Sequence, residues 1–291
     1  MDRFRGLIPP MVTPIAGGAP DARGIAALVD HSVEHLDGMV VGGSCGEGPS
    51  LGGTGRLEVL GRFIDAVAGR LPVIAGVAST SLSDIADLIA AGDQIGVAGY
   101  LVPPPFYFTN SATGVMSFFG EVAGMTDREV IIYDNPKTTK TPMSVELLTS
   151  IVERSTNINH VKVTDTDLDK VTDLHERSDA TLLAGSDEVM HHQVLRGCEG
   201  AVTAAPQVFP RRCRAWFDTA VAGGGRADYD RLLPLVIELI QGPDQYPAVV
   251  KHALLALGVL ASDEVLPPLT PLDDRRRREI AAVIHSDGTD E

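Results

Sequence analysis

The sequence contains few cysteines and no long apolar run, and both shortages exclude classes of protein. Its 291 residues include three cysteines, Cys45, Cys198 and Cys213, none at Cys-x-x-Cys spacing. A disulfide-based secreted scaffold and a structural zinc site are therefore not expected. No segment approaches the roughly 20 consecutive apolar residues of a membrane-spanning helix, and residues 1–5 do not resemble a signal peptide. We expect a cytoplasmic protein without a membrane partner.

Basic residues are scarce relative to acidic ones. The chain has 24 Lys and Arg against 39 Asp and Glu, which gives a formal net charge of −15 at pH 7. Such a surface repels nucleic acids and anionic membranes. The basic block at residues 275–278 lies between Asp274 and Glu279, a pattern typical of a solvated helix face. Nucleic acid is therefore not an expected partner.

The sequence does contain an alternation of short apolar runs and longer amphipathic segments. Hydrophobic residues make up 44% of the chain and charged residues 22%, the balance of a globular protein with a sizeable core. Continuous apolar runs are typical of strands that are buried on both faces, as in a parallel sheet. Eight such runs predict strands at residues 7–12, 39–43, 72–77, 98–102, 130–133, 158–163, 181–184 and 200–203.

The segments between these runs predict helices. Clear examples are residues 22–36, 83–95 and 144–152, where apolar residues recur with helical spacing. About eight strand–helix units in succession favour a closed (β/α)8 TIM barrel in the α/β class. An open, doubly wound sheet is the alternative, because the sequence does not show closure directly.

The pattern changes after the predicted eighth strand, where strands stop and helices continue. One of these helices is expected to complete the barrel. We assign residues 1–222 to the barrel and residues 223–291 to a C-terminal helical extension. The helices are predicted at residues 211–222, 228–241, 245–257 and 271–285.

Polar and aromatic side chains gather at the predicted carboxyl ends of the strands. In a parallel barrel these ends meet on one rim, and the catalytic groups of the fold lie there. We therefore expect a nucleophile, hydroxyls and carboxylates to converge on a single pocket. The residues at these positions are Ser44, Cys45, Gly46, Tyr107, Tyr133, Lys162, Thr164, Asp187, Glu188 and Thr203.

Lys162 is the most informative of these residues. It lies between Val161 and Val163 in an apolar predicted strand. An ammonium group inside a barrel is unfavourable unless it is paired or neutralised, and a neutral amine is the nucleophile that attacks a ketone. A side chain that leans outward between helices is the alternative. The residues alone leave these two interpretations open.

Seven short motifs follow one another in a fixed order along the chain. Each is weak alone, but their order and spacing together resemble the dihydrodipicolinate synthase / N-acetylneuraminate lyase family, from residue 6 to about residue 210. The motifs are GLIPPMVTP at 6–14, GSCGE at 43–47, PPFY at 104–107, YDNP at 133–136, VKVT at 161–164, GSDE at 185–188 and GAV at 200–202.

The resemblance implies a mechanism. Lys162 would form a Schiff base with a 2-keto acid such as pyruvate, and Tyr133 would act as general acid and base beside the imine. A phenol is a weak acid near neutrality, so Ser44 and Tyr107 would complete a hydroxyl relay. Tyr107 would reach in from a neighbouring subunit, which implies a homo-oligomer, a dimer or a tetramer.

The resemblance also implies substrate contacts. Backbone N–H groups of residues 43–46, a loop that contains Cys45 and Gly46, would hold the keto-acid carboxylate, because a glycine-rich turn exposes donors to an anion. Thr164 and Thr203 would contact the rest of the substrate.

Structural roles stay open for several of these residues. Asp187 is expected either to bind substrate hydroxyls or to cap a helix at residues 189–195, and Glu188 either to bind substrate or to favour the first turn of that helix. Tyr133 is equally compatible with a packed aromatic, and Ser44 with a turn cap.

The sequence departs from the family pattern at four positions. Cys45 stands where threonine is usual, and its predicted proximity to the reactive lysine suggests redox sensitivity. Asp134 replaces an asparagine, which is unfavourable near an anionic substrate unless the carboxylate is hydrogen-bonded or points away. Thr138 stands where synthases carry an arginine for the second substrate's carboxylate, and Lys137 is a point charge in a different place. Ala204 lies near the place where the resemblance to a neuraminate lyase implies a hydroxyl residue.

We therefore predict a Schiff-base-forming, pyruvate-dependent lyase or aldolase that cleaves or forms a 2-keto-3-deoxy acid. Its partners would be a keto acid, pyruvate, and an aldehyde. A dihydrodipicolinate synthase that condenses pyruvate with aspartate semialdehyde is the alternative within the family. A non-catalytic barrel that binds keto acids is the alternative from another class.

The predicted chemistry needs no metal and no organic cofactor. One segment imitates a calcium loop, with Asp165, Asp167 and Asp169 at alternate positions. Lys170 occupies the place of the glycine that such a loop needs for its sharp turn, so calcium is not expected.

Overall fold

Eight parallel strands form the centre of the structure, a computed structural model that describes residues 4–240 and 246–286. Neighbouring strands are hydrogen-bonded in the order β1-β10-β9-β8-β7-β6-β5-β4, and each pair is parallel. All eight predicted strands are present. They are β1 (Gly6–Leu7), β4 (Met39–Val41), β5 (Val73–Gly76), β6 (Gly99–Val102), β7 (Glu129–Asp134), β8 (His160–Val163), β9 (Thr181–Ala184) and β10 (Cys198–Ala201).

The sheet closes on itself beyond the end of β1. Val40 of β4 forms a parallel bridge with Pro10. The Val40 amide donates to the Pro9 carbonyl over 3.0 Å, and the Met11 amide donates to the Val40 carbonyl over 2.8 Å. The two ends of the strand order are therefore joined. The predicted (β/α)8 barrel is confirmed, and the open sheet is excluded.

The first and last strands differ from their predicted limits. β1 ends at Leu7 instead of residue 12, because Pro9 and Pro10 have no N–H to donate to a ladder. β10 begins at Cys198, two residues before the prediction, and its register with β9 shifts between Cys198 and Gly200. Because β10 ends at Ala201, Thr203 lies beyond the strand instead of at its end.

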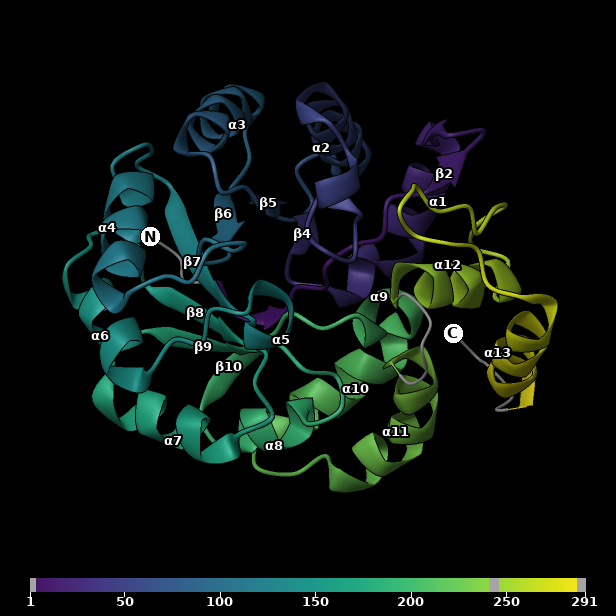
Figure 1. Cartoon of the computed structure of the whole chain (residues 1–291). Helices are drawn as coiled ribbons and strands as arrows, with labels where there is room; N and C mark the ends of the chain where they lie inside the picture. The colour runs from purple at the N-terminus through teal and green to yellow at the C-terminus, as the bar shows by residue number, and fades with distance from the viewer. Residues whose placement is uncertain (1–3, 241–245, 287–291) are drawn as a thin grey trace.

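Helices surround the barrel, as Figure 1 shows. They form where the sequence supplies a cap and an apolar stripe. In α6, for example, the Ser144 hydroxyl accepts the Leu147 amide at 3.3 Å, and Leu148 and Ile151 are buried against the core. The helices before β10 are α1 (Ala22–Ser32), α2 (Gly53–Val67), α3 (Leu82–Ile95), α4 (Ala112–Ala123), α5 (Pro136–Thr139), α6 (Val145–Glu153), α7 (Leu168–Arg177) and α8 (Met190–Leu195), with short 3-10 turns η1 (Val33–His35) and η2 (Gly48–Ser50).

A small hairpin, β2 (Ile15–Ala16) with β3 (Ala19–Pro20), was not predicted. Its turn is Gly17-Gly18, whose φ angles of 61° and 79° suit glycine. The Glu264 carboxylate accepts both glycine amides, at 2.8 and 2.7 Å. A segment near the C-terminus thus holds a turn near the N-terminus.

Among the described residues after β10 the regular elements are all helices, as predicted. α10 packs on β1, α1 and α8 and completes the outer layer, while α11, α12 and α13 pack on one another beside α9 and α10 (Figure 1). The predicted helix ends at Gln241 and Gln245 lie outside the described residues, and the division after residue 222 stays a prediction. The helices are α9 (Ala205–Val208), α10 (Pro210–Ala220), α11 (Arg226–Ile240), α12 (Tyr246–Ala256) and α13 (Asp274–Ser286).

Two apolar clusters stabilise this arrangement. The larger lies between the strands and the helices. The smaller fills the barrel interior, where alternate side chains of each strand point inward. Its members are Ile8, Val40, Ile74, Leu101, Ile131, Leu183 and Val202, with Tyr133 packed against them.

None of the helices in the described ranges is long and apolar enough to cross a membrane.

The interior cluster leads to a stability prediction. Leu183 is fully buried in the barrel, so Leu183→Ala is expected to lower the free energy of unfolding by about 2–5 kcal/mol through lost burial and a residual cavity. Urea denaturation measures this change. The matched variant Leu195→Ala, on a side chain that is 48% exposed, should change it by no more than about 0.5 kcal/mol. Equal losses in both variants would contradict the assignment of Leu183 to a close-packed interior.

Candidate active site

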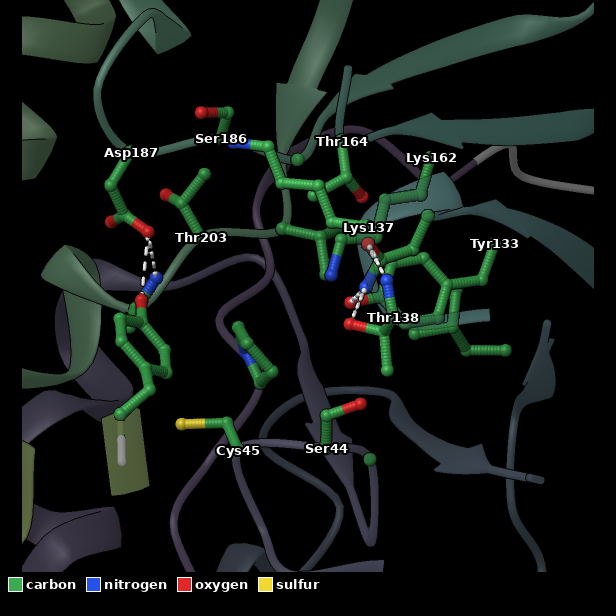
Figure 2. A pocket seen from close by; sticks show the side chains of 18 of the residues that line it. Ser44, Cys45, Tyr133, Lys137, Thr138, Lys162, Thr164, Ser186, Asp187 and Thr203 are labelled. Atoms are coloured by element: carbon green, nitrogen blue, oxygen red, sulfur yellow. Dashed lines mark hydrogen bonds between the residues drawn. The ribbon is translucent and has the colours of Figure 1, made fainter. Parts of the chain in front are cut away.

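A cavity of about 360 Å³ opens at the carboxyl ends of the strands. The predicted site residues line it, except Gly46 and Tyr107. Figure 2 shows their side chains entering from different strands and loops. The residues that the structure brings together are Ser44, Cys45, Tyr133, Lys162, Thr164, Asp187, Glu188 and Thr203.

Lys162 points into the barrel, which excludes the outward orientation. It is paired in register with Tyr133 on the neighbouring strand. Its Nζ lies 4.0 Å from the centroid of the Tyr133 ring, and the residue is only 4% exposed. No carboxylate in the described part of the chain forms an ion pair with it. A buried amine that lacks a counter-charge and faces a cavity is suited to nucleophilic attack.

Asn135, which the sequence reading overlooked, binds the hydroxyl of Tyr133. Its Nδ2 donates to Tyr133 Oη at 2.9 Å and to Thr138 Oγ1 at 3.0 Å. Its Oδ1 accepts the Thr138 amide at 3.4 Å, so Asn135 also caps α5. Thr138 lines the cavity, at the position that the family resemblance assigns to an arginine in synthases. Lys137 beside it contributes an exposed cation to the rim.

Tyr107 does not reach the cavity of its own chain. It is 88% exposed, and its ring packs edge-on against Phe108 with centroids 5.1 Å apart. Its φ of 83° is strained for a tyrosine. The predicted relay of Ser44, Tyr107 and Tyr133 is therefore not assembled within one chain.

The loop after β4 is tightly built around Cys45 and Gly46. A Cβ on Gly46 would meet the Met11 carbonyl oxygen at 2.8 Å, so only glycine fits there. Gln207 Nε2 donates to Cys45 Sγ at 3.5 Å. Burial raises the pKa of the Cys45 thiol to about 12. The suggestion of redox sensitivity is therefore wrong, because a thiol that stays protonated near neutrality is a poor nucleophile.

Asp187 has a structural role that differs from the predicted cap. Its Oδ1 accepts the Ala205 amide at 2.7 Å, and its Oδ2 accepts the Ala204 amide at 3.1 Å. It thus caps α9 from a distance instead of α8, whose N-terminus has no side-chain cap. Tyr246 donates its hydroxyl to the same Oδ2 at 2.8 Å. Three donors compete with any substrate hydroxyl for this carboxylate.

The other polar side chains of the cavity are less constrained. Glu188 is exposed and lines the cavity, and its carboxylate has no side-chain partner among the described residues. Thr164 Oγ1 is buried and has no hydrogen-bond partner in the described structure. Thr203 donates its hydroxyl to Met190 Sδ at 3.4 Å. Thr164 and Glu188 are therefore the two groups most available to a ligand.

Asp134 points away from the cavity. Side chains alternate along β7, so Asp134 faces the helices whereas Tyr133 faces the barrel interior. Its Oδ2 accepts Lys170 Nζ at 2.5 Å. Burial raises the pKa of Asp134, and Lys170 opposes this shift. The departure from asparagine therefore places no charge beside the substrate.

The calcium-like segment has structural roles. Asp167 caps α7 by accepting the Asp169 amide at 3.0 Å, and Asp165 accepts the Asp167 amide at 3.2 Å. No group of three acidic, histidine or cysteine residues suited to a metal occurs within residues 4–240 and 246–286.

Comparison with known proteins identifies the family. Residues 3–287 match the model of the dihydrodipicolinate synthetase family. The chain belongs to this family. This confirms the predicted resemblance and the predicted class, a Schiff-base-forming lyase.

Individual relatives carry the names of different activities. YagE of Escherichia coli K12, provisionally named a 2-dehydro-3-deoxy-D-gluconate aldolase, is 31% identical over 97% of this chain and 96% of its own. A 4-hydroxy-tetrahydrodipicolinate synthase from Sphingopyxis alaskensis is 32% identical over 98% of this chain and 99% of its own. A solved structure of YagE in complex with pyruvate superposes with a TM-score of 0.90 at 28% identity, covering 98% of this chain and 99% of that chain.

A buried histidine supports the loop after β9 from outside the cavity. His191 on α8 is 1% exposed and stacks on Tyr229 with ring centroids 5.1 Å apart. Trp216 Nε1 donates to His191 Nδ1 at 3.2 Å, so this nitrogen must be unprotonated. Tyr229 in turn donates to the backbone carbonyls of Asp187 and Glu188, at 3.0 and 2.6 Å.

The environment of His191 predicts a pH dependence of stability. Burial lowers the pKa of His191, with the neighbouring His192 as a smaller cause. The unfolded chain therefore binds a proton at this histidine more readily than the folded chain does. The stability that comes from burying the neutral imidazole is complete above the ordinary histidine pKa of about 6.5 and is lost as the pH falls below it. The free energy of unfolding, measured in urea from pH 7.5 to 5, should fall less steeply in His191→Gln than in the wild type. The exposed control His175→Gln should keep the wild-type slope, and an unchanged slope in His191→Gln would refute the assignment.

Proposed function

We propose that this lyase is a pyruvate-dependent aldolase that cleaves or forms a 2-keto-3-deoxy acid. The observation that carries the proposal is Lys162, a buried amine without a carboxylate partner among the residues that the structure describes, placed against Tyr133 at the wall of the cavity. The pyruvate complex of YagE and that protein's provisional name support the choice of substrate class.

The proposed reaction assigns a role to each of these two residues. The Lys162 amine attacks the keto carbon, the oxygen leaves as water, and a protonated imine results. In the cleavage direction Tyr133 accepts the proton of the C4 hydroxyl while the C3–C4 bond breaks, and the imine takes up the electron pair as an enamine. The aldehyde leaves, C3 is protonated, and hydrolysis releases pyruvate and the free lysine.

The remaining contacts follow from what each group can still bind. Backbone N–H groups of residues 43–46 are proposed to hold the keto-acid carboxylate. Thr164 and Glu188 are proposed to bind substrate hydroxyls, because neither side-chain oxygen is engaged within the described chain. Asp187 is assigned instead to holding α9, with Thr203 beside it.

The synthase alternative is not favoured. A hydroxyl at Thr138 cannot replace a bidentate guanidinium for a carboxylate substrate, and the exposed Lys137 is a point charge on a flexible stem. Useful condensation of pyruvate with aspartate semialdehyde would reverse this ranking.

Imine trapping tests the proposal. Borohydride reduction in the presence of pyruvate should add one reduced pyruvate to the intact mass, and peptide mapping should place it on Lys162. Lys162→Ala should show neither adduct nor turnover, whereas Lys137→Ala, which removes a second lysine of the cavity, should keep the adduct. Equal labelling in Lys162→Ala would overturn the imine mechanism. An adduct without cleavage of any 2-keto-3-deoxy acid would point to the non-catalytic barrel.

We further propose a homo-oligomer, a dimer or tetramer, located in the cytoplasm. Exposed Tyr107 and Phe108 form an aromatic pair on the surface. An apolar cavity of about 300 Å³ adjoins the active site and shares Ser44 and Tyr133 with it. A neighbouring subunit's tyrosine that enters this cavity would complete the hydroxyl relay.

This assembly has a measurable consequence. Sedimentation should give a dimer or tetramer for the wild type, and Tyr107→Phe should keep the assembly while lowering turnover about 10²-fold or more through loss of a proton-relay hydroxyl. Phe108→Leu, which preserves Tyr107, serves as the control and should keep the relay. A wild-type monomer with full activity would remove Tyr107 from the mechanism.

A further inference from the structure

Helix α12 contacts the keto-acid side of the cavity through a buried ion pair. Lys251 and Glu47 have fully buried side chains and are bonded to each other. Lys251 Nζ also donates to the Glu264 carbonyl at 2.6 Å, and Glu47 Oε2 accepts the Leu266 amide at 2.6 Å. Burial lowers the pKa of Lys251, and Glu47 opposes this shift. Two residues separate Glu47 from Ser44 in the loop proposed to hold the keto-acid carboxylate.

Movement of Glu47 would move that loop. Its φ of 57° is in the left-handed region, which a glutamate adopts only when its surroundings hold it there. The Glu47 amide donates to the Ser44 carbonyl at 3.2 Å, and the Gly48 amide donates to the Gly43 carbonyl at 3.0 Å. The turn is therefore closed on itself, and its position depends on where the Glu47 carboxylate is held.

The first residue of α12 contacts a second wall of the cavity. Tyr246 lines the cavity and donates its hydroxyl to Asp187 Oδ2 at 2.8 Å. Asp187 holds the amides of Ala204 and Ala205 at the start of α9, directly after Thr203. The only proton of the Tyr246 hydroxyl is thus committed to Asp187, and its oxygen is left able to accept a hydrogen bond.

Helix α9 links the loop that contains Glu47 to the contact between Tyr246 and Asp187. Gln207 on this helix is fully buried, and its Nε2 donates to the Pro10 carbonyl at 2.8 Å and to Cys45 Sγ at 3.5 Å. Its Oε1 accepts the Val12 amide at 2.8 Å. α9 therefore lies between the Asp187–Tyr246 contact and the loop that contains Cys45.

We propose that α12 is a positioning element of the active site. Lys251 positions the keto-acid side through Glu47, and Tyr246 positions, through Asp187, the wall that contains Glu188, the adjacent residue proposed to bind substrate hydroxyls. This inference rests on the proposed aldolase function, because only a reaction with two substrate halves gives the two contacts different kinetic effects.

The Tyr246 contact is tested by comparing two tyrosines whose hydroxyls each donate to a carboxylate. In Tyr246→Phe the concentration of pyruvate that half-saturates borohydride inactivation should stay unchanged, while kcat/KM for cleavage of 2-dehydro-3-deoxy-D-gluconate should fall about tenfold, the effect of one hydrogen bond to a charged group. Tyr100→Phe is the control, since Tyr100 also donates to a carboxylate, Asp93 Oδ1, at 2.8 Å but lies outside the cavity. It should leave both values unchanged.

The Lys251 contact requires a double variant, because Lys251→Met alone leaves a buried carboxylate without its partner and is expected to fold poorly. In Glu47→Gln/Lys251→Met the half-saturating pyruvate concentration should rise about tenfold. The control is Asp134→Asn/Lys170→Met, which removes a buried pair on the outer side of β7 and should not change that concentration.

The outcomes distinguish a failure of the proposed aldolase function from a failure of the proposed role of α12. A wild-type enzyme without a trapped adduct would overturn the proposed function and the role of α12 with it. A wild-type adduct combined with unchanged kinetics in both α12 variants would overturn the role of α12 alone. The same result would follow if each variant shifted both kinetic values by the same factor, because that pattern indicates a general loss of structure.

Discussion

Closure of the parallel ladder is the constraint on which the rest of the structure depends. The bridge between Pro10 and Val40 joins the two ends of the strand order, so strand ends that are far apart in the sequence share one rim. Pro9 and Pro10 shorten β1, but the Pro9 carbonyl still accepts the Val40 amide of β4. The pocket exists because these ends meet, and no segment of the chain could form it alone.

Charge compensation distinguishes the reactive group from the structural ones. Asp134 is paired with Lys170 outside the barrel, and Glu47 is paired with Lys251 beneath the loop after β4. Lys162 faces an aromatic ring instead of a carboxylate in the described structure. Burial of a lysine without a counter-charge is unfavourable for stability, and a protein retains it where a nucleophilic amine is needed. The same low-polarity surroundings keep the Cys45 thiol protonated.

The residues that the sequence reading overlooked have a common character. Asn135, Gln207 and Tyr246 carry no catalytic group of their own, and each acts by holding another side chain in place. Asn135 lies in a recognisable motif, so a signal for it was present. Gln207 and Tyr246 lie in helices beyond the last motif, and no local pattern connects them to Cys45 or Asp187. Their partners are 162 and 59 residues away in the chain.

The sequence by itself determined the α/β class, the eight strands and the positions of Lys162 and Tyr133 at the carboxyl ends of two of them, because hydrophobic periodicity and strand order are local properties of the chain. Only the tertiary structure decided that the sheet closes, that Asp187 caps α9 instead of α8, and that Tyr107 lies outside the cavity of its own chain. Each of these features depends on contacts between residues that are far apart in the sequence. Packing of the whole fold, and not any short segment, sets the geometry of those contacts.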